Sequence, residues 1–257
     1  ITNLTISIKQ GNRPYGRNES IKLAKGEIIA ITDAGCVLDK HWLEELVKPF
    51  TDPETQVVSG YYAGKPKTAL QQALIPYVLV MPDKVNTSLF LPSTRSMAIK
   101  KHVWEMLGGF PIEYRWNEDY VFSKRIEKAG IPIVFARKAI VYWFPRETFF
   151  EGFRMFSAFA TGDAQAGLWR KKVVFLIFRV IAGCVLLFLI LKHPSVQLHY
   201  LFVFCIVSYF FFAVAKNYRY VSGILAIMHL PCWQIISDIA VFTGSFVGFF
   251  DRNSSKV

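Results

Sequence analysis

The sequence has few cysteines, and their spacing does not form a metal-binding or disulfide pattern. There are four in 257 residues, and no two of them are spaced as Cys-x-x-Cys. Cys184, Cys205 and Cys232 lie within apolar runs. A zinc site or a disulfide framework is therefore not expected. The cysteines, Cys36 included, are interpreted as small buried hydrophobic side chains.

Acidic residues are scarce compared with basic ones. The chain has 30 Lys and Arg against 19 Asp and Glu, which gives a formal net charge of +11. Such a charge suits nucleic acids, membrane surfaces or anionic substrates. The sequence has no nucleic-acid recognition module and no aromatic RNA-binding signature, so no nucleic-acid partner is expected. Basic residues beside long apolar runs indicate membrane lipids instead.

The start of the sequence lacks an initiator methionine and a signal peptide. It begins Ile-Thr-Asn and enters a predicted strand, Leu4 to Ile8, at once. Because the domain opens within a strand pattern, we expect it to be N-terminally incomplete.

Long apolar runs dominate the C-terminal part of the chain. Hydrophobic residues make up 53% of the sequence, more than in ordinary soluble domains. The first run, Val173 to Leu191, contains one charge, Arg179, and at about 1.5 Å per residue it would be about 28 Å long, close to the bilayer core. Leu198 to Ala215 predicts a second span and Ile224 to Phe250 a third. Two to three transmembrane helices are therefore expected over 173–250, followed by a tail at 251–257.

Polar residues distinguish the third run from the other two. It contains Pro231, Gln234 and Asp238, which fit poorly in a straight helix that faces lipid. A bent or re-entrant segment therefore stays open beside a full third span.

Basic residues next to the runs predict the orientation in the membrane. Arg170-Lys171-Lys172 and Lys216 with Arg219 flank the two ends that should share a side, and the positive-inside rule makes that side cytoplasmic. Arg179 is close enough to this end to reach the interface. We thus expect a multi-pass protein of the inner or plasma membrane, with residues 146–172 as an amphipathic interfacial linker and the preceding domain in the cytoplasm.

Residues 1–145 alternate predicted strands with predicted helices. Helices are expected over Glu19 to Lys25 (capped by Asn18), Lys40 to Phe50 (capped by Asp39), Lys101 to Leu107, and from the cap Asn117 through Ala129. Strands are expected over Ile28 to Thr32, Gln56 to Tyr62, Met97 to Ile99, Ile131 to Phe135 and Ala139 to Trp143. This order predicts an α/β fold with a mostly parallel sheet.

Two places in this domain carry carboxylates in positions suited to chemistry. Asp33 follows the apolar strand directly, and ligands of open α/β sheets bind beyond the carboxyl ends of strands. There it can meet a ribose hydroxyl or a divalent cation, or it can simply cap a turn. Glu118-Asp119 follow a Gly-Gly turn and open a helix, whose N-terminus favours an ionised carboxylate able to act as a general base. Acidic residues are also common in any first helical turn.

The ordered set of these features resembles the family 2 glycosyltransferases, inverting enzymes of the GT-A fold that use nucleotide sugars. The matching stretches are "GRNESIKLAKGEIIAITDAGCVLDKHWLEEL", "STRSMAIKKHVWEMLGGF" and "NEDYVFSKRIEKAG". The resemblance implies a GT-A-like domain with a Rossmann-type mixed sheet over about residues 1–145, followed by transmembrane helices.

The resemblance also implies roles for single residues. Asp33 matches the first aspartate of the family's Asp-x-Asp, which binds the ribose and the metal-bridged diphosphate. Asp119 matches the catalytic base, with Glu118 beside it. Arg17 and Asn18 lie where the family often contacts the donor, although Asn18 equally suits a helix cap.

This sequence departs from the family pattern at several points. Gly35 stands where the second aspartate would provide a metal ligand, so dependence on Mg²⁺ or Mn²⁺ is in doubt. Either Asp33 alone would hold the cation, or arginine and lysine charge would meet the diphosphate instead. The Gln-x-x-Arg-Trp of processive members is reduced to Arg154 in "EGFRM", which argues against a processive synthase and equally fits an ordinary interfacial helix. Arg115-Trp116 are candidates for stacking on an acceptor sugar, or for packing.

The expected reaction is a single displacement. Asp119 takes the proton of an acceptor hydroxyl, which attacks the anomeric carbon and expels the nucleoside diphosphate. Membrane attachment suggests a lipid-linked or cell-surface glycan as the acceptor. Three alternatives stay open: an inactive GT-A-like membrane scaffold, a transport protein that uses Asp238 and Gln234, and another nucleotide-sugar or nucleotidyl enzyme on the same fold.

Overall fold

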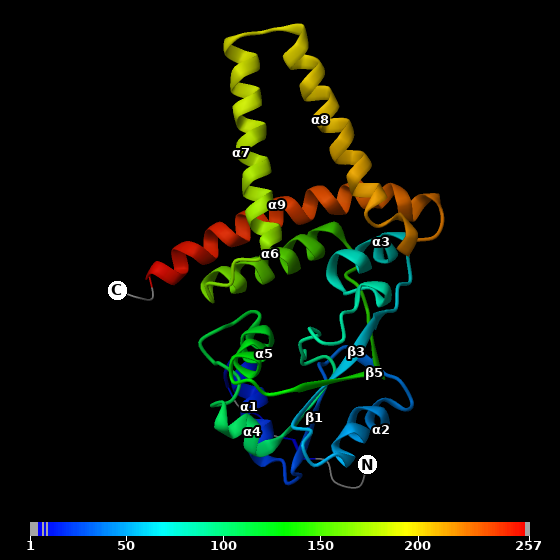
Figure 1. The fold of residues 1–257 in the computed structure, drawn as a ribbon, viewed down its shortest axis with the longest axis vertical. Coiled ribbons are helices and arrows are strands. Elements are labelled where there is room, and N and C mark those ends of the chain that lie inside the picture. The colour runs from blue at the N-terminus through cyan, green and yellow to red at the C-terminus, as the bar shows by residue number, and fades with distance from the viewer. Residues whose placement is uncertain (1–4, 7, 9, 255–257) are drawn as a thin grey trace. The chain divides into compact units, whose positions relative to one another are not determined.

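The computed structural model describes residues 5, 6, 8 and 10–254 (Figure 1). The chain folds into two compact units. The first comprises the described residues up to Lys65 together with Leu79–Phe144, and the second comprises Pro66–Val78 and the residues from Pro145 onward. The strand expected over Leu4 to Ile8 includes residues that lie outside the described part of the chain.

A mixed, five-stranded sheet forms the centre of the first unit, counted over the described residues. Its order is β1-β4-β3-β5-β2, with bounds β1 Ile28–Ile31, β2 Cys36–Leu38, β3 Val57–Gly64, β4 Met97–Lys100 and β5 Ile133–Trp143. Within the described sheet only β3 and β5 pair in parallel, while β1 with β4, β4 with β3 and β5 with β2 are antiparallel. The expectation of a mostly parallel sheet is therefore wrong. Hydrophobic periodicity predicts where strands lie but carries no information on their direction, and β4 enters between β1 and β3 from the opposite end.

Strand β5 is one element where two strands were expected. Its pairing with β3 runs from Ile133 to Ala136 and resumes at Ile140, opposite a shift between Gly60 and Tyr61. The polar residues between the two apolar stretches form this irregularity rather than a turn. The prediction of two strands is wrong because a bulge and a turn produce a similar break in the apolar pattern.

Three helices of the first unit begin within two residues of the predicted places, whereas the first helix begins six residues before the predicted Glu19. Their bounds are α1 Arg13–Leu23, α2 Trp42–Val47 continued by the 3-10 turn Lys48–Thr51, α4 Lys101–Met106 and α5 Glu118–Lys128, with a further 3-10 turn at Pro82–Lys84. Asn12, not Asn18, caps α1, because its Oδ1 accepts a hydrogen bond from the Tyr15 N–H at 3.1 Å. The side chain of Asp39 accepts from the N–H of His41, which holds the cap position of α2. Asn117 precedes α5 in the left-handed conformation (φ 57°), and its side chain makes no capping bond.

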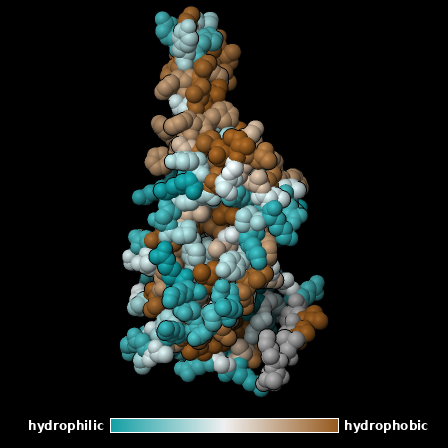
Figure 2. Space-filling view, turned by 90° about the vertical axis from the view of Figure 1, so that its right-hand side faces the viewer, coloured by the Kyte–Doolittle hydropathy of each residue, from teal (hydrophilic) through white to brown (hydrophobic). Residues whose placement is uncertain are grey.

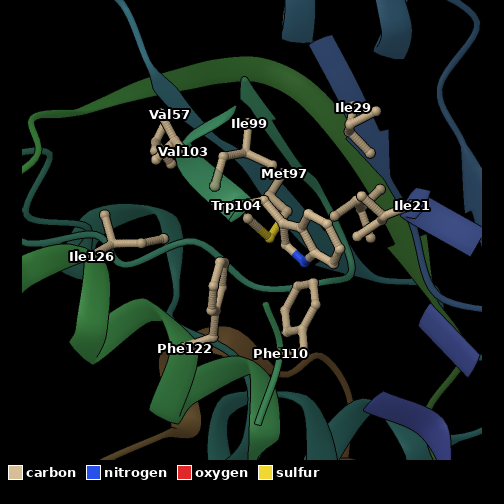
Figure 3. Close-up of a cluster of buried hydrophobic side chains, with 11 residues drawn as sticks. Ile21, Ile29, Val57, Met97, Ile99, Val103, Trp104, Phe110, Phe122 and Ile126 are labelled. Atoms are coloured by element: carbon tan, nitrogen blue, oxygen red, sulfur yellow. The ribbon is translucent and has the colours of Figure 1, made fainter. Parts of the chain in front are cut away.

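The two faces of the sheet carry different cores, because successive strand residues point to opposite sides. Helices α1, α4 and α5 cover one face, where Trp104, Phe110 and Phe122 pack around Met97 and Ile99 (Figure 3). Helix α2 covers the other face with Trp42 and Leu46, packed against Val58, Ala98, Ala139 and Val141. One layer of helices thus lies on each side of the sheet.

The second unit consists of helices. Their bounds are α3 Ala69–Val78, α6 Phe149–Gln165, α7 Lys171–Lys192, α8 Val196–Ala215 and α9 Ile224–Ser254, with a 3-10 turn at Tyr218–Tyr220. Three stretches, Lys171–Lys192, Val196–Tyr220 and Ile224–Arg252, are long and apolar enough to cross a membrane. Helices α7 and α8 form a hairpin whose surface is largely apolar (Figures 1 and 2).

One prediction about side chains in these helices is wrong. Cys184, Cys205 and Cys232 are exposed on the helix surfaces instead of buried, and Cys36 of the first unit is half-buried. Little protein covers the two helices that carry Cys184 and Cys205, and Cys232 lies on the exposed side of α9. Arg179 forms an ion pair with Asp238 of α9, and its reach to the membrane interface stays a prediction.

Candidate functional site

Arg17 joins two candidate carboxylates, Asp33 and Glu118, that lie far apart in the sequence. Its Nη2 lies 3.2 Å from Asp33 Oδ1, and its Nη1 lies 3.1 Å from Glu118 Oε1. The side chain of Glu118 is 5% exposed, that of Arg17 15% and that of Asp33 35%. The three side chains form one cluster, in which the guanidinium of Arg17 lies between the buried Glu118 and the partly exposed Asp33.

Asp33 stands beyond the end of β1, as predicted, and both of its oxygens have hydrogen-bond donors. Arg17 donates to Oδ1, and the buried hydroxyl of Thr94 donates to Oδ2 at 3.1 Å. The next turn passes through Gly35, whose φ of +86° favours glycine. The backbone there turns away into β2, so position 35 provides conformational freedom and no side-chain ligand.

Asp119 is held by a hydroxyl from the same loop that holds Asp33. Ser93 Oγ donates to Asp119 Oδ2 at 3.0 Å, and the N–H of Tyr120 donates to Oδ1 at 2.8 Å. Ser123 of α5 in turn donates to the carbonyl of Pro92 and fixes the loop on this helix. One short loop therefore aligns the carboxylate at the end of β1 with the acidic start of α5.

Asn18 makes both of its described hydrogen bonds to the backbone of Phe110. Its Nδ2 donates to the Phe110 carbonyl at 2.8 Å, and its Oδ1 accepts from the Phe110 N–H at 2.9 Å. Gly109, the residue before Phe110, has a φ of +73°. A Cβ on Gly109 would lie 3.0 Å from Asn18 Oδ1 and 3.1 Å from the Trp104 ring. The Gly-Gly turn thus allows α1 and the loop before α5 to approach closely, which keeps Arg17 opposite Glu118.

An arginine-aromatic group lies next to the start of α5. The guanidinium of Arg13 is 4.9 Å from the ring centre of Trp116, and that of Arg115 is 5.4 Å away. Arg13 Nη2 also donates to the Arg115 carbonyl at 3.2 Å. Trp116 is half-buried and Arg115 exposed. These contacts give Trp116 a packing role, and its contact with an acceptor sugar stays a prediction.

A second arginine lies near Asp33. The Arg95 guanidinium lies 5.4 Å from the ring centre of Tyr62 and 6.0 Å from that of Trp143, an arrangement of cation–π contacts. Burial raises the pKa of the Cys36 thiol; the charge of Asp33 raises it further and Arg95 opposes this. Asp33 and Arg95 thus act on the pKa of the Cys36 thiol with opposite signs.

The donor set does not fit a divalent cation held by the protein alone. In the part of the chain that the structure describes, no three His, Cys, Asp or Glu side chains gather as ligands. Asp33 has both oxygens engaged, and Gly35 adds no ligand. Mg²⁺ is often held by one or two carboxylates together with substrate phosphates, so the metal role of Asp33 stays a prediction. Arg154 belongs to the second unit, on α6, where it is exposed and lies 5.9 Å from the Phe150 ring centre. Its acceptor role also stays a prediction.

A family model, glycosyl transferase family 21, matches residues 17–215, most of the chain. The chain belongs to glycosyl transferase family 21. A mannosyltransferase from Pyrobaculum calidifontis, solved with GDP-Man and Mn²⁺, is similar in structure to this family 21 member. The TM-score is 0.57 and the identity 17%, with 91% of this chain and 67% of that one covered.

A second solved structure shares less with the family 21 chain. GalNAc-T7 with UDP, GalNAc and Mn²⁺ has a TM-score of 0.42 and 15% identity, and the match covers 61% of this chain and 35% of that one. A comparison with curated proteins finds no match. The family confirms the predicted glycosyltransferase, and the likeness to the mannosyltransferase confirms the GT-A-like fold.

Sequence reasoning missed Ser93 and Thr94. Both are buried, and their hydroxyls bind the two candidate carboxylates. The signal was a run of hydroxyl residues, Pro-Ser-Thr-Arg-Ser, immediately before β4. Small hydroxyl residues are common in loops, so only the contacts of Ser93 and Thr94 with the two carboxylates distinguish them from ordinary loop residues in this family 21 chain.

Proposed function

We propose that the chain is a membrane-bound, inverting glycosyltransferase that moves a sugar from a nucleotide-sugar donor to a hydroxyl of a lipid-linked or cell-surface glycan. The observation that carries this proposal is that Arg17 forms ion pairs with both Asp33 and Glu118. Membership of family 21 supports the transfer chemistry. The mannosyltransferase similar in fold binds a nucleotide sugar, which supports the class of donor. Three apolar helices support the membrane attachment, with the catalytic domain expected on the cytoplasmic side of an inner or plasma membrane.

In the proposed reaction Asp119 is the general base. The acceptor O–H proton moves to its carboxylate, and the acceptor oxygen forms a bond to the anomeric carbon. The bond from that carbon to the diphosphate oxygen breaks on the opposite face, and the nucleoside diphosphate leaves with the electron pair. The Ser93 hydrogen bond supports this role, because it orients the carboxylate without neutralising it.

Arg17 and Asp33 are proposed as the donor side of the site. Asp33, 35% exposed, would accept from a ribose hydroxyl, and the Arg17 guanidinium would meet the negative charge of the diphosphate. Glu118 is then a positioning residue that holds Arg17. No step is assigned to a divalent cation, because the donor set described above does not fit one held by the protein.

The decisive experiment compares the full chain with its Asp119→Asn variant in membrane vesicles. Transfer should fall by about 10²- to 10⁴-fold, the usual contribution of a general base. Glu113→Gln is the matched control, because Glu113 is an exposed acid a few residues away that pairs with Arg125. Equal transfer by the wild type and the Asp119→Asn variant would refute the base assignment.

Binding of a nucleoside diphosphate separates this proposal from the scaffold alternative. A ligand present at 100 times its Kd stabilises the folded state by about 2.7 kcal/mol, so thermal unfolding should shift upward. Comparing the shift in Mn²⁺ with the shift in EDTA tests the predicted metal role of Asp33, because a cation shared with the diphosphate would make the shift larger in Mn²⁺. A wild-type chain that gains no stability from UDP or GDP, in Mn²⁺ or EDTA, and transfers no sugar would be the inactive scaffold.

A further inference from the structure

Helix α9 has one face buried against protein and one face that is apolar and exposed. On the buried face, Trp233 is enclosed and its Nε1 donates to the Leu70 carbonyl of α3 at 2.9 Å. The exposed face carries large apolar side chains at helical spacing: Leu225, Met228, Ile235, Ile239, Phe242, Phe246 and Phe249. A stripe of this length on a helix of 31 residues requires an apolar environment along its whole side.

The buried face of α9 is formed largely by α6, which runs beside it in the same direction. Gly152 of α6 lies against Trp233, and further along Ser157 lies against Gly244. A Cβ on Gly244 would be 2.3 Å from the Ser157 carbonyl oxygen, so the two backbones are in direct contact. Thr161 Oγ1 donates to the Gly244 carbonyl at 3.1 Å. The two helices therefore behave as one rigid layer.

Both ends of α9 lie at the same end of the α7–α8 hairpin. The hairpin is antiparallel, so the start of α7 and the end of α8 lie together at its base. The C-terminal part of α9 contacts the residues just before α7, since the rings of Phe249 and Trp169 are 6.4 Å apart. The N-terminal residue Ile224 follows the end of α8 after a short connection. Helix α9 thus crosses the base of the hairpin and does not run along it (Figure 1).

The middle of α9 is bound to both hairpin helices at this base. Asp238 pairs with Arg179 of α7 and accepts a hydrogen bond from Tyr209 Oη of α8 at 2.8 Å. Beyond these contacts the hairpin has little protein around it. In an apolar 18-residue window of each stretch, 11% of the residues are buried for Lys171–Lys192 and 6% for Val196–Tyr220, against 33% for Ile224–Arg252. The exposed apolar surface of the hairpin would be covered by lipid on all sides, whereas α9 exposes apolar side chains on one face only.

We propose that α9 is not a third transmembrane span but an interfacial helix, which lies with α6 along the membrane surface and buries its apolar stripe in the bilayer. Interfacial helices combine an apolar face with nearby basic residues, which bind anionic lipid headgroups. The basic residues at this level are Arg170, Lys171, Lys172, Lys216, Arg219 and Arg252. Trp169 also stands at the entry of α7, where indole rings favour the membrane–water interface. The inference rests on the proposed membrane attachment and is independent of the sugar-transfer chemistry.

Single cysteines in the full chain test this topology. The native cysteines are replaced by serine, and Ser222→Cys, Asp251→Cys and His193→Cys are introduced one at a time before α9, near its end and at the hairpin tip. Membrane vesicles of both orientations are treated with a membrane-impermeant maleimide. Positions 222 and 251 should label from one side and position 193 from the other.

Each possible result decides a separate point. Labelling of positions 222 and 251 from opposite sides would make α9 a span and overturn the inference. Labelling of position 193 from the same side as 222 would show that the hairpin does not cross the membrane, which overturns the two-span topology on which the inference rests and leaves the transfer chemistry untouched. As a second measurement, spin labels at Ile239→Cys and Val185→Cys report depth through collisions with oxygen. Ile239 should be much shallower than Val185, and equal depth would also overturn the inference.

Discussion

Replacing Arg17 by methionine should destabilise the first unit strongly, because it removes the only described partner of a buried carboxylate. The Glu118 side chain is 5% exposed and its Oε1 lies 3.1 Å from Arg17 Nη1. Breaking a buried ion pair by removing one partner costs about 3–5 kcal/mol. Arg17 itself is 15% exposed, which lowers this cost, and the pair with Asp33, which is 35% exposed, adds little. We therefore expect a loss of about 2–4 kcal/mol in all. Methionine keeps the apolar stem of the side chain, so the charge is the main quantity that changes.

The assay is thermal unfolding of the full chain in detergent, followed by tryptophan fluorescence. At roughly 2–4 °C per kcal/mol for a chain of this size, Tm should fall by about 4–16 °C. The matched control is Arg125→Met in α5, whose ion pair with Glu113 is largely exposed, and its Tm should change by no more than about 2 °C. The double variant Arg17→Met/Glu118→Gln should recover part of the loss, because the buried charge has gone as well. An Arg17→Met variant no less stable than Arg125→Met would refute the ion-pair argument.

Two further predictions concern the same unit. Gly60→Ala should lower stability by roughly 1–3 kcal/mol or more, measured as a fall in Tm, because its Cβ would lie 1.9 Å from Ser96 Oγ and 2.7 Å from the Ala139 carbonyl oxygen; an unchanged Tm would contradict this. In a chain whose only cysteine is Cys36, alkylation at pH 8 should be slower than that of a free thiol, because burial raises the pKa of Cys36 and leaves less thiolate. Asp33→Asn removes a charge that contributes to this rise, so the pKa of Cys36 should fall and alkylation should quicken; a slower reaction would contradict the sign.

The sequence allowed prediction of features that depend on local pattern. The end of β1 at Asp33 and the start of α5 at Glu118 follow from apolar periodicity and helix-start chemistry, which act over a few residues. Features set by distant contacts were not predictable in this way. Asn18 is a residue type that often caps helices, yet its side chain binds the backbone of Phe110, 92 residues away. The hydroxyls of Ser93 and Thr94 can reach the carboxylates only because the sheet places β4 beside β1.

The direction of strands also depends on long-range pairing. The apolar pattern of β4 is compatible with either direction, and only its pairing with β1 and β3, which are distant in the sequence, makes it antiparallel. The same limit applies to the second unit. The polar residues of the third apolar stretch leave a full span and a bent segment both open, and only the contacts of α9 with α6 and with the base of the hairpin indicate how this helix differs from the other two.

The place of α3 in the second unit has a consequence for the order in which the chain folds during synthesis. Residues 66–78 are made early, yet Tyr77 Oη donates to the Leu230 carbonyl and the Leu70 carbonyl accepts from Trp233, both made about 150 residues later. Domains generally fold as they emerge from the ribosome, N-terminal parts first. Helix α3 must therefore wait, with its apolar face unpaired, until α9 has been made. A chain cut after residue 144 would keep α3 but never provide its partner, so such a truncation should aggregate unless α3 is also replaced.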